Sequence, residues 1–407
     1  MADLLGFISI SFVSIITLII ALRWPGISNI LIVALCIRII ILLIGHYIGP
    51  LPGGGSDAIG YENRAWNLSQ KGFLVVLSSF DFNPFVFFSW LHAIPYSLFG
   101  RSIIMGQSIS LLCGIGTIFY AWKLANLIWG ERIAKKVGWT LALFPSVVLY
   151  SILFMREAYI CFFLVLALYG VVSWIKNNTY KSIFLSLMGF IAASLFHGPM
   201  IAGAIIFIIF VFTTYLNRLF KSLVNFRINI ENLVIFLFCV TVIGLYFSNK
   251  ISFSYLGTFE NSSDINYLIQ RQNSYLSGDA SWPEWTIARS VTELIYKAPI
   301  RMIYFVFSPF PWDVEKVVHL IGFFDSILYL YLVILILYNI KVIWREPSLR
   351  IILLILLFYI FVFAFGVGNF GTAFRHKSKF AFMFIILAAP LINTLIINKK
   401  VNSSHLK

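Results

Sequence analysis

The amino-acid sequence predicts an all-α, polytopic integral membrane protein. Of its 407 residues, 60% are hydrophobic and 11% are charged, whereas a soluble domain carries about 25% charged residues. Apolar runs of about 20 residues, the length of a membrane-crossing helix, recur along the whole chain. A transmembrane β-barrel would instead alternate apolar and polar residues in short segments. The lipid bilayer is therefore the first expected partner.

Eleven helical spans account for the apolar runs. The first run lacks the basic start and the small-residue cleavage site of a signal peptide, so we expect it to be retained. The segment 298–312 is apolar but short and ends in SPFPW, which favours a re-entrant or interfacial segment. The expected spans are residues 3–22, 28–48, 102–129, 138–154, 158–175, 182–196, 198–215, 232–248, 318–344, 349–366 and 380–397.

Three regions follow from this division. Residues 1–248 form a transmembrane module whose first outer loop covers 49–101, residues 249–317 form a large loop that includes the re-entrant segment, and residues 318–407 form the C-terminal helices and tail. All the cysteines lie within apolar runs, which is typical of small core residues and not of a disulfide or metal set. They are Cys36, Cys113, Cys161 and Cys239.

The charges are distributed unequally between the two sides of the membrane. The net charge is +14; the connections on one side carry 16 Lys/Arg and 3 Asp/Glu, and those on the other carry 13 and 12. Short basic loops stay in the cytoplasm, so we expect the N-terminus outside and the C-terminal tail in the cytoplasm. The positive charge is thus an orientation signal, and no nucleic-acid partner is expected.

A polar loop, LPGGGSDAIGYENRAWNLSQKG, covers residues 51–72 on the outer side. Its three glycines allow a sharp turn or a close approach of the backbone to a ligand. Residues 56–71 read as a short amphipathic surface helix. Either Ser56 or Asp57 can cap this helix; alternatively, Asp57 is a carboxylate that takes a proton from an attacking hydroxyl group.

Two further polar motifs lie on the outer side. In FMREAY, Arg156 and Glu157 form a local ion pair, or Glu157 is a second active-site acid. As an active-site acid it would help to hold the acceptor, the partner of the Asp57 carboxylate or, with Asp57, a divalent metal ion. In LFHGPM, His197 is an interfacial hydrogen-bonding residue or a contact to a phosphate group or a sugar hydroxyl group. The residue types alone leave both questions open.

A basic cluster in GTAFRHKSKF departs from the positive-inside trend. Arg375, His376, Lys377 and Lys379 place positive charge on the outer side. They are either snorkelling side chains at the interface or a phosphate clamp in which Arg375 offers its planar fork to phosphate oxygens.

Other polar residues are less informative. The loop motifs SWPEW and SPFPW suit sugar stacking or an interfacial aromatic belt, and no spacing selects one of the nearby acids, which are Asp264, Glu284, Glu293 and Asp313. Arg38 and Asp325 lie within spans, where they pair with each other or face a lipid-phosphate groove.

Residues 50–175 resemble the N-terminal module of the GT-C superfamily of membrane glycosyltransferases, which includes protein mannosyltransferases and lipid A aminoarabinose transferases. The motifs DAIGYENRAWNLSQKG and FMREAY carry the two outer acids of that pattern. The chain departs from it in an additional first span, in the Glu of MREA and in a less diagnostic C-terminal half. The matching positions, in order, are Asp57, Tyr61, Pro84, Gly100, Arg101, Arg132, Lys135, Lys136, Pro145, Ser146 and Glu157.

The resemblance implies an enzyme that moves a sugar or oligosaccharide from a polyprenyl-(di)phosphate donor to a cell-envelope glycan. It implies a prokaryotic inner membrane, chemistry on the extracytoplasmic face as in O-antigen and other polysaccharide biosynthesis, and other envelope-assembly proteins as candidate partners. Asp57 and Glu157 would be the catalytic acids. The residues expected to bind substrate and phosphate are Arg375, His376, Arg156, Tyr61, His197 and Lys377.

Two alternatives remain. The motifs FMREAYICFFLVLALY, LFHGPM, FSPFPW and GTAFRHKSKFAF also resemble O-antigen and exopolysaccharide repeat-unit polymerases, which rely on outer-face arginines more than on a carboxylate. A transporter of lipid-linked glycans would instead require polar residues along a pore through the middle of the spans.

Overall fold

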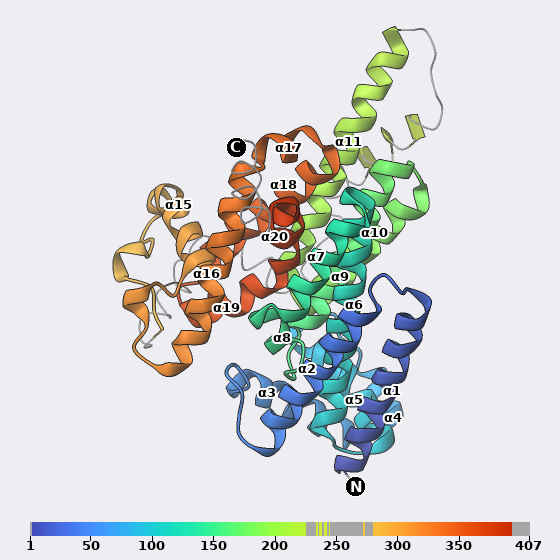
Figure 1. Cartoon of the computed structure of the whole chain (residues 1–407), viewed down its shortest axis with the longest axis vertical. Helices are drawn as coiled ribbons and strands as arrows, with labels where there is room; N and C mark the ends of the chain where they lie inside the picture. Colours follow the sequence, from blue (N-terminus) through green and yellow to red (C-terminus); the bar gives the residue numbers. More distant parts are fainter. Residues whose placement is uncertain are drawn as a thin grey trace, which may run out of the picture.

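The computed structural model describes residues 2–224 and 280–392, with a few isolated positions between them. In these ranges the chain is helical, with one isolated β-bridge between Ser281 and Asn369, which confirms the all-α class (Figure 1). The α-helices are α1 (Ala2–Arg23), α2 (Ser28–Tyr47), α3 (Ser56–Ser69), α4 (Phe73–Ser78), α5 (Pro84–Phe99), α6 (Ile103–Trp129), α7 (Glu131–Leu143), α8 (Pro145–Tyr150), α9 (Glu157–Asn177), α10 (Tyr180–Phe196), α11 (Ile201–Val224), α15 (Val291–Phe307), α16 (Val317–Tyr338), α17 (Ile340–Arg345), α18 (Pro347–Gly366), α19 (Phe370–Lys377) and α20 (Ala381–Ala388).

Within the described ranges, seven helices are long and apolar enough to cross a membrane: α1, α2, α6, α9, α11, α16 and α18. The chain is thus a multi-pass membrane protein, but the expectation of eleven uninterrupted spans needs correction. Helix α10 is a shorter apolar helix, and of the segment expected to be re-entrant, 298–312, residues 298–307 belong to α15. The expected span 232–248 lies outside the continuously described residues, and the last one is described only to residue 392.

The span expected at 138–154 is broken between α7 and α8. Phe144 is extended, with ψ 119°, because the following Pro145 disfavours a helical conformation in the residue before it. Arg38 donates hydrogen bonds of 2.9 and 3.4 Å to the carbonyl groups of Ala142 and Leu141 at the end of α7. The carbonyl groups freed by the break therefore keep a hydrogen-bond donor.

Asp325 supports the other side of the break. One of its carboxylate oxygens accepts a hydrogen bond of 3.2 Å from the backbone N–H of Ser146, at the start of α8. A carboxylate at a helix N-terminus and a guanidinium at a helix C-terminus both match the helix dipole. Arg38 and Asp325 thus bind the two ends of one helix break, and the expected direct pair between them does not form.

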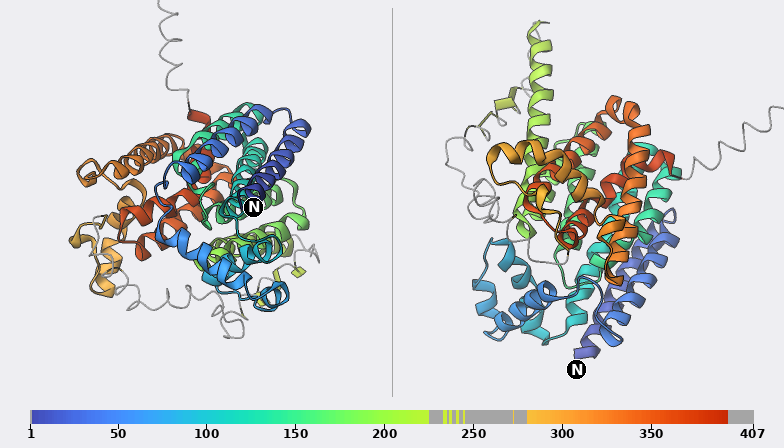
Figure 2. Two further views of the ribbon diagram at one scale, coloured as in Figure 1. Left: turned by 90° about the horizontal axis from the view of Figure 1, so that it is seen from below. Right: turned by 90° about the vertical axis from the view of Figure 1, so that its left-hand side faces the viewer.

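The connections between helices gather at two opposite ends of the bundle. Helices α3, α4 and α5 lie together at one end, called here the α3 end, and helix α17 lies at the other (Figures 1 and 2). Lys176 and Glu346 form an ion pair of 2.9 Å at that opposite end, and Arg218 donates to Asn178 across 3.2 Å. Because the connections there carry most of the excess Lys and Arg, we call it the basic end.

Helix α6 provides the surface on which the segment after α8 packs. A Cβ atom placed on Gly114 would lie 2.5 Å from Cβ of Ser151, and one on Gly106 would lie 2.2 Å from the ring of Phe154. Glycine at these two positions lets residues 151–154 lie directly against the helix. This contact fixes the segment that leads into α9.

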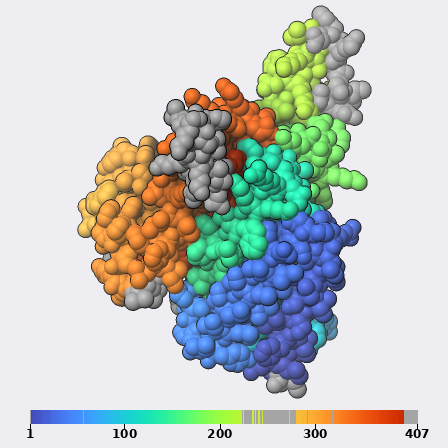
Figure 3. All heavy atoms as spheres, in the orientation of Figure 1, coloured from blue at the N-terminus to red at the C-terminus, as the bar shows by residue number. Residues whose placement is uncertain are grey.

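On the face seen in Figure 3, the N-terminal helices and the region around α15 and α16 form two flanks, with the stretch from α6 to α9 between them. The region around α15 is tied to α19 through the backbone. The N–H of Trp282 donates to the carbonyl group of Gly368, and the N–H of Phe370 donates to that of Ala280, each across 2.9 Å. These bonds hold the start of α19, where the basic cluster follows.

Candidate functional site

Helix α3 carries Asp57 in its first turn. Gly53 adopts φ +80°, a left-handed conformation that favours glycine, and turns the chain into the helix. The residue at the N-cap position is Gly55, and no side chain caps the helix. The capping alternative for Asp57 is therefore wrong: its carboxylate lies 58% exposed and accepts a hydrogen bond from Arg375 instead.

Glu157 is the first residue of α9, so its carboxylate lies at the positive end of the helix dipole. Its side chain is only 1% exposed. One carboxylate oxygen, Oε1, accepts a hydrogen bond of 2.6 Å from Nε of Arg375 and lies 3.6 Å from Nζ of Lys379. A buried charge is costly unless it is paired, and this pairing satisfies that requirement.

Arg375 joins the two acids. Its Nε binds Glu157 and its Nη1 binds Asp57, so one guanidinium bridges a buried and an exposed carboxylate. The Arg375 side chain is 15% exposed, between the 1% of Glu157 and the 58% of Asp57. Burial lowers the pKa of Arg375, but the charge and hydrogen bond of Glu157 and the charge of Asp57 raise that pKa above its ordinary value. The guanidinium therefore stays charged.

Helical spacing separates the members of the basic cluster. Arg375 and Lys379 are four residues apart and share one side of the turn, whereas Lys377 points away. The fully buried ammonium group of Lys377 donates to the carbonyl groups of Val306 and Ser308, at 3.2 and 3.1 Å, and to Oγ of Ser326 at 2.7 Å. Lys377 therefore holds the end of α15 against α16, away from the acids, and we withdraw it from the expected phosphate-binding set.

Lys379 is at the site, although it was not among the residues expected to bind substrate or phosphate. It is fully buried, and burial lowers the pKa of its ammonium group well below the ordinary value, against the opposing effect of Glu157. Its Nζ lies 2.7 Å from Nδ1 of His376. The rings of His376 and His197 are 5.3 Å apart, so both predicted histidines lie next to this group.

Arg156 belongs to the same end of the bundle but does not form the expected local ion pair with Glu157. Its Nη1 donates to the carbonyl group of Phe196 across 3.1 Å, and its guanidinium lies over the rings of Tyr61 and Phe85, at 5.5 and 4.9 Å. Burial lowers the pKa of Arg156. These contacts bring Tyr61 and Arg156 beside the acids.

A small cavity lies behind Glu157. It measures about 10 Å³, room for about one water molecule, and its walls include Thr117, Tyr150 and Ser151. The second oxygen of Glu157, Oε2, is buried and has no hydrogen-bond partner within the described structure. Ser151 accepts a hydrogen bond of 2.9 Å from Nε of Arg38. Arg38 therefore links one wall of the cavity to the helix break at the end of α7.

The geometry does not favour the metal ion considered between Asp57 and Glu157. The guanidinium of Arg375 already bridges the two carboxylates. No group of three or more His, Cys, Asp or Glu side chains with metal-binding geometry occurs among the described residues. The arrangement instead offers cationic hydrogen-bond donors to an anion, with one exposed carboxylate beside them.

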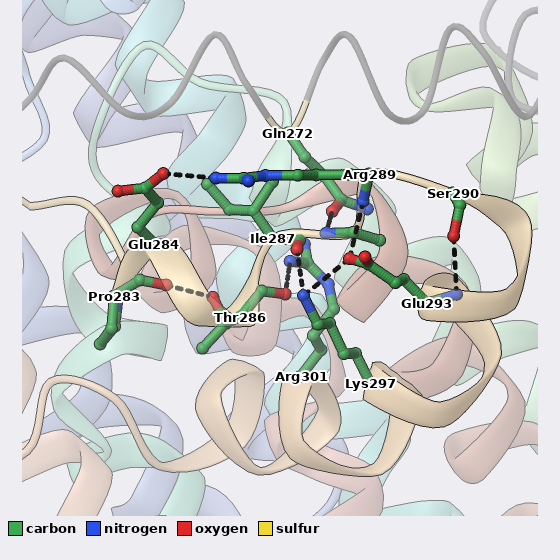
Figure 4. Close-up of polar contacts among 11 residues, drawn as sticks. Gln272, Pro283, Glu284, Thr286, Ile287, Arg289, Ser290, Glu293, Lys297 and Arg301 are labelled. Carbon is green, nitrogen blue, oxygen red and sulfur yellow. Dashed lines mark hydrogen bonds and ion pairs between the residues drawn. The ribbon is translucent and has the colours of Figure 1, made fainter.

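A second polar cluster surrounds α15 and is drawn in Figure 4. Glu284 pairs with Arg289 at 2.6 Å, and Glu293 pairs with Lys297 at 2.8 Å. Arg301 is fully buried and donates to the carbonyl groups of Thr286 and Ala364, each at 2.9 Å, and of Val367. Glu284 is 65% exposed, but its partner Arg289 is 71% exposed, so this pair lacks the buried carboxylate that holds Arg375 at the α3 end.

Comparison of the chain with protein-family models, with curated proteins and with solved structures finds no match. The assignment of function therefore depends on the residues of the α3 end alone.

Proposed function

We propose that the protein is a membrane glycosyltransferase that moves a sugar or oligosaccharide from a polyprenyl-(di)phosphate donor to a cell-envelope glycan. The observation that carries this proposal is the bridge formed by Arg375 between exposed Asp57 and buried Glu157. A phosphate group is a bidentate partner for a guanidinium group. It can take the place of the Asp57 carboxylate on Arg375 while Glu157 holds the guanidinium from below.

This exchange couples donor binding to activation of the acid. Once a phosphate group occupies Arg375, Asp57 no longer has its cationic partner and is available to take the proton of the acceptor hydroxyl group. The hydroxyl oxygen attacks the anomeric carbon from the face opposite the phosphate, the bond to the phosphate oxygen breaks, and the configuration inverts. Arg375 stabilises the negative charge on the departing phosphate. No metal-dependent step is part of the proposal.

The neighbouring residues complete the proposed site. Lys379 and His376 lie beside Glu157 and contact each other, and Arg156 lies over Tyr61. We assign Arg156 and His376 to the donor phosphate, and Tyr61 and His197 to the sugar or acceptor. Because short basic loops stay in the cytoplasm, we place the basic end there and the α3 end on the extracytoplasmic face of a prokaryotic inner membrane.

A repeat-unit polymerase is the second candidate. The grouping of Arg375, Arg156 and Lys379 near Glu157 favours it, because several cations suit a diphosphate-linked donor. Both candidates transfer a glycan and differ in product. A transferase adds a single unit, whereas a polymerase yields a ladder of chain lengths.

The test compares Arg375→Gln with Arg101→Gln. Arg101 also pairs with an acid of α3, binding Glu62 at 2.9 and 2.5 Å, but it lies outside the proposed site. A deletion strain should lose one envelope glycan by mass spectrometry. Wild type and Arg101→Gln should restore it, and Arg375→Gln should lower it by about 100-fold or more.

The proposal fails if Arg375→Gln restores the glycan as well as Arg101→Gln does. Proteoliposomes that contain the lipid-linked glycan accumulated by the deletion strain provide a second test. Movement of that lipid across the bilayer without a new glycosidic bond would identify a transporter and would also contradict the proposal.

A further inference from the structure

A second pocket lies at the basic end, outside the proposed glycosyltransferase site. It has a volume of about 350 Å³ and opens where the end of α9, the second half of α11 and the start of α18 meet. A pocket of this size falls within the range of small-ligand sites, about 300–1,000 Å³. It therefore has room for a phosphate group together with the groups attached to it.

The charged side chains of the pocket are all cationic. Arg218 and Arg350 line it, and no carboxylate does among the described residues. Glu346, the acid that directly precedes α18, is outside the lining and is paired with Lys176 at 2.9 Å. An anion entering the pocket therefore meets two guanidinium groups.

Arg218 is held in position before any ligand binds. Its Nη1 donates to Oδ1 of Asn178 across 3.2 Å, and its guanidinium carbon lies 5.0 Å from the centre of the Tyr215 ring. A guanidinium has five N–H donors, so this contact leaves most of them for a ligand. Arg350 forms no hydrogen bond or ion pair through its side chain with the described residues, which leaves its whole fork available.

Trp174 forms a buried part of the pocket wall. It lines the pocket and is 2% exposed, and its indole Nε1 is buried without a hydrogen-bond partner within the described structure. A buried N–H group without a partner costs free energy, and an indole N–H group can only donate. This N–H group is not accessible from the pocket, so the ring contributes apolar surface to the site.

We propose that this pocket binds a phosphate group, with the headgroup of an anionic phospholipid as the favoured source. The two arginines are donors suited to phosphate oxygens. The apolar walls formed by Trp174, Ile175 and Phe210 suit the glycerol and acyl portion of a lipid. Basic pockets between membrane helices are known lipid-headgroup sites. The inference does not depend on the reaction proposed for the α3 end.

The test uses the full-length protein in a neutral detergent and counts bound phospholipid by native mass spectrometry. The probes are phosphatidylglycerol, phosphatidylcholine and inorganic phosphate. The pocket variant is Arg218→Gln/Arg350→Gln. The matched control is Lys341→Gln/Arg345→Gln, which removes the same charge from α17, outside the pocket lining.

We expect phosphatidylglycerol to bind wild type and the control equally and the pocket variant about tenfold or more weakly. Phosphatidylcholine should bind all three weakly. If inorganic phosphate also binds wild type and not the pocket variant, the site takes a free phosphate group. If inorganic phosphate binds neither protein, the ligand is the lipid.

Equal phosphatidylglycerol binding by the pocket variant and the control would overturn the proposal. Should the double variant fail to fold, Arg350→Gln alone decides, because it breaks no side-chain contact within the described structure.

Discussion

Arg375 and Glu157 lie 218 residues apart in the sequence and are joined by a hydrogen bond of 2.6 Å between Nε and Oε1. Through the same guanidinium, Asp57 is joined to the pair from 318 residues away. The three side chains come from α19, α9 and α3, so the site exists only when these helices are assembled. Their different depths lead to different expectations for each acid.

The two acids should differ in their effect on stability. Glu157→Gln leaves the buried guanidinium and ammonium groups near it without their shared anion, and we expect it to lower the free energy of unfolding by about 3 kcal/mol. Asp57→Asn removes an exposed partner and should cost about 1 kcal/mol or less. Thermal unfolding in detergent measures both. Equal losses of unfolding free energy for the two variants would show that burial of the carboxylate does not determine how much its ion pair stabilises the fold.

Both acid variants should nevertheless lose glycan transfer under the proposed mechanism. Asp57→Asn removes the proton acceptor, and Glu157→Gln removes the group that positions Arg375. Glu62→Gln is the matched control, because Glu62 also lies on α3 and pairs with an arginine. Transfer by Asp57→Asn at the wild-type rate would remove Asp57 from the proposed chemistry.

Lys379 should give donor binding a pH dependence. Burial lowers the pKa of its ammonium group well below the ordinary 10.5. The protonated form adds positive charge beside the residues that bind the donor phosphate and exists below that lowered pKa, so donor affinity should fall as pH rises through a range below 10.5. Lys379→Arg stays charged and should flatten the profile. The measurement is KM for the donor against pH; superimposable profiles would contradict this role.

His92 should make the fold sensitive to acid. Its Nδ1 donates to the carbonyl group of Phe88 across 2.8 Å and its Nε2 accepts from the Tyr159 hydroxyl group at 2.9 Å, which is the pattern of a neutral ring. Burial lowers the pKa of His92 from 6.5 to about 4. Stability is therefore complete above pH 6.5 and is lost as pH falls toward 4.

We expect wild type to lose about 2 kcal/mol of unfolding free energy between pH 7 and pH 5 through His92. The measurement is the difference in thermal stability between wild type and His92→Gln at the two pH values, since Gln does not titrate. A difference that does not change with pH would contradict the assignment.

Ser151 should affect the rate of transfer by positioning the segment that leads to Glu157. Ser151→Ala removes the hydrogen bond that Nε of Arg38 donates, at a cost of about 2 kcal/mol, and loosens the segment that leads to Glu157. We expect slower transfer even well below the unfolding temperature. Ser108→Ala is the control, because Ser108 is equally buried but bonds only to Ile104 of its own helix. Equal rates for the two variants would leave Ser151 a purely structural residue.

The sequence alone determined the class of protein and its local features. Hydropathy identifies membrane helices because a helix needs about 20 consecutive apolar residues to cross the bilayer, and such a run is visible in the local sequence. The surface helix expected at 56–71 is α3, Ser56–Ser69, because its cues are local. The spacing of Arg375 and Lys379 already contained the signal that separates Lys377 from them, since residues four apart share a helix face.

Tertiary structure decided the partners of the charged residues. Asp57 could cap its helix or bind elsewhere, and Glu157 could pair with Arg156, as far as neighbouring residues reveal. The packing of α3, α9 and α19 places both acids within hydrogen-bond distance of Arg375. At the helix break before Pro145, Arg38 binds the end of α7 and Asp325 binds the start of α8. Ion-pair energy depends on distance in space, and distances between residues far apart along the chain are fixed only when the helices pack together.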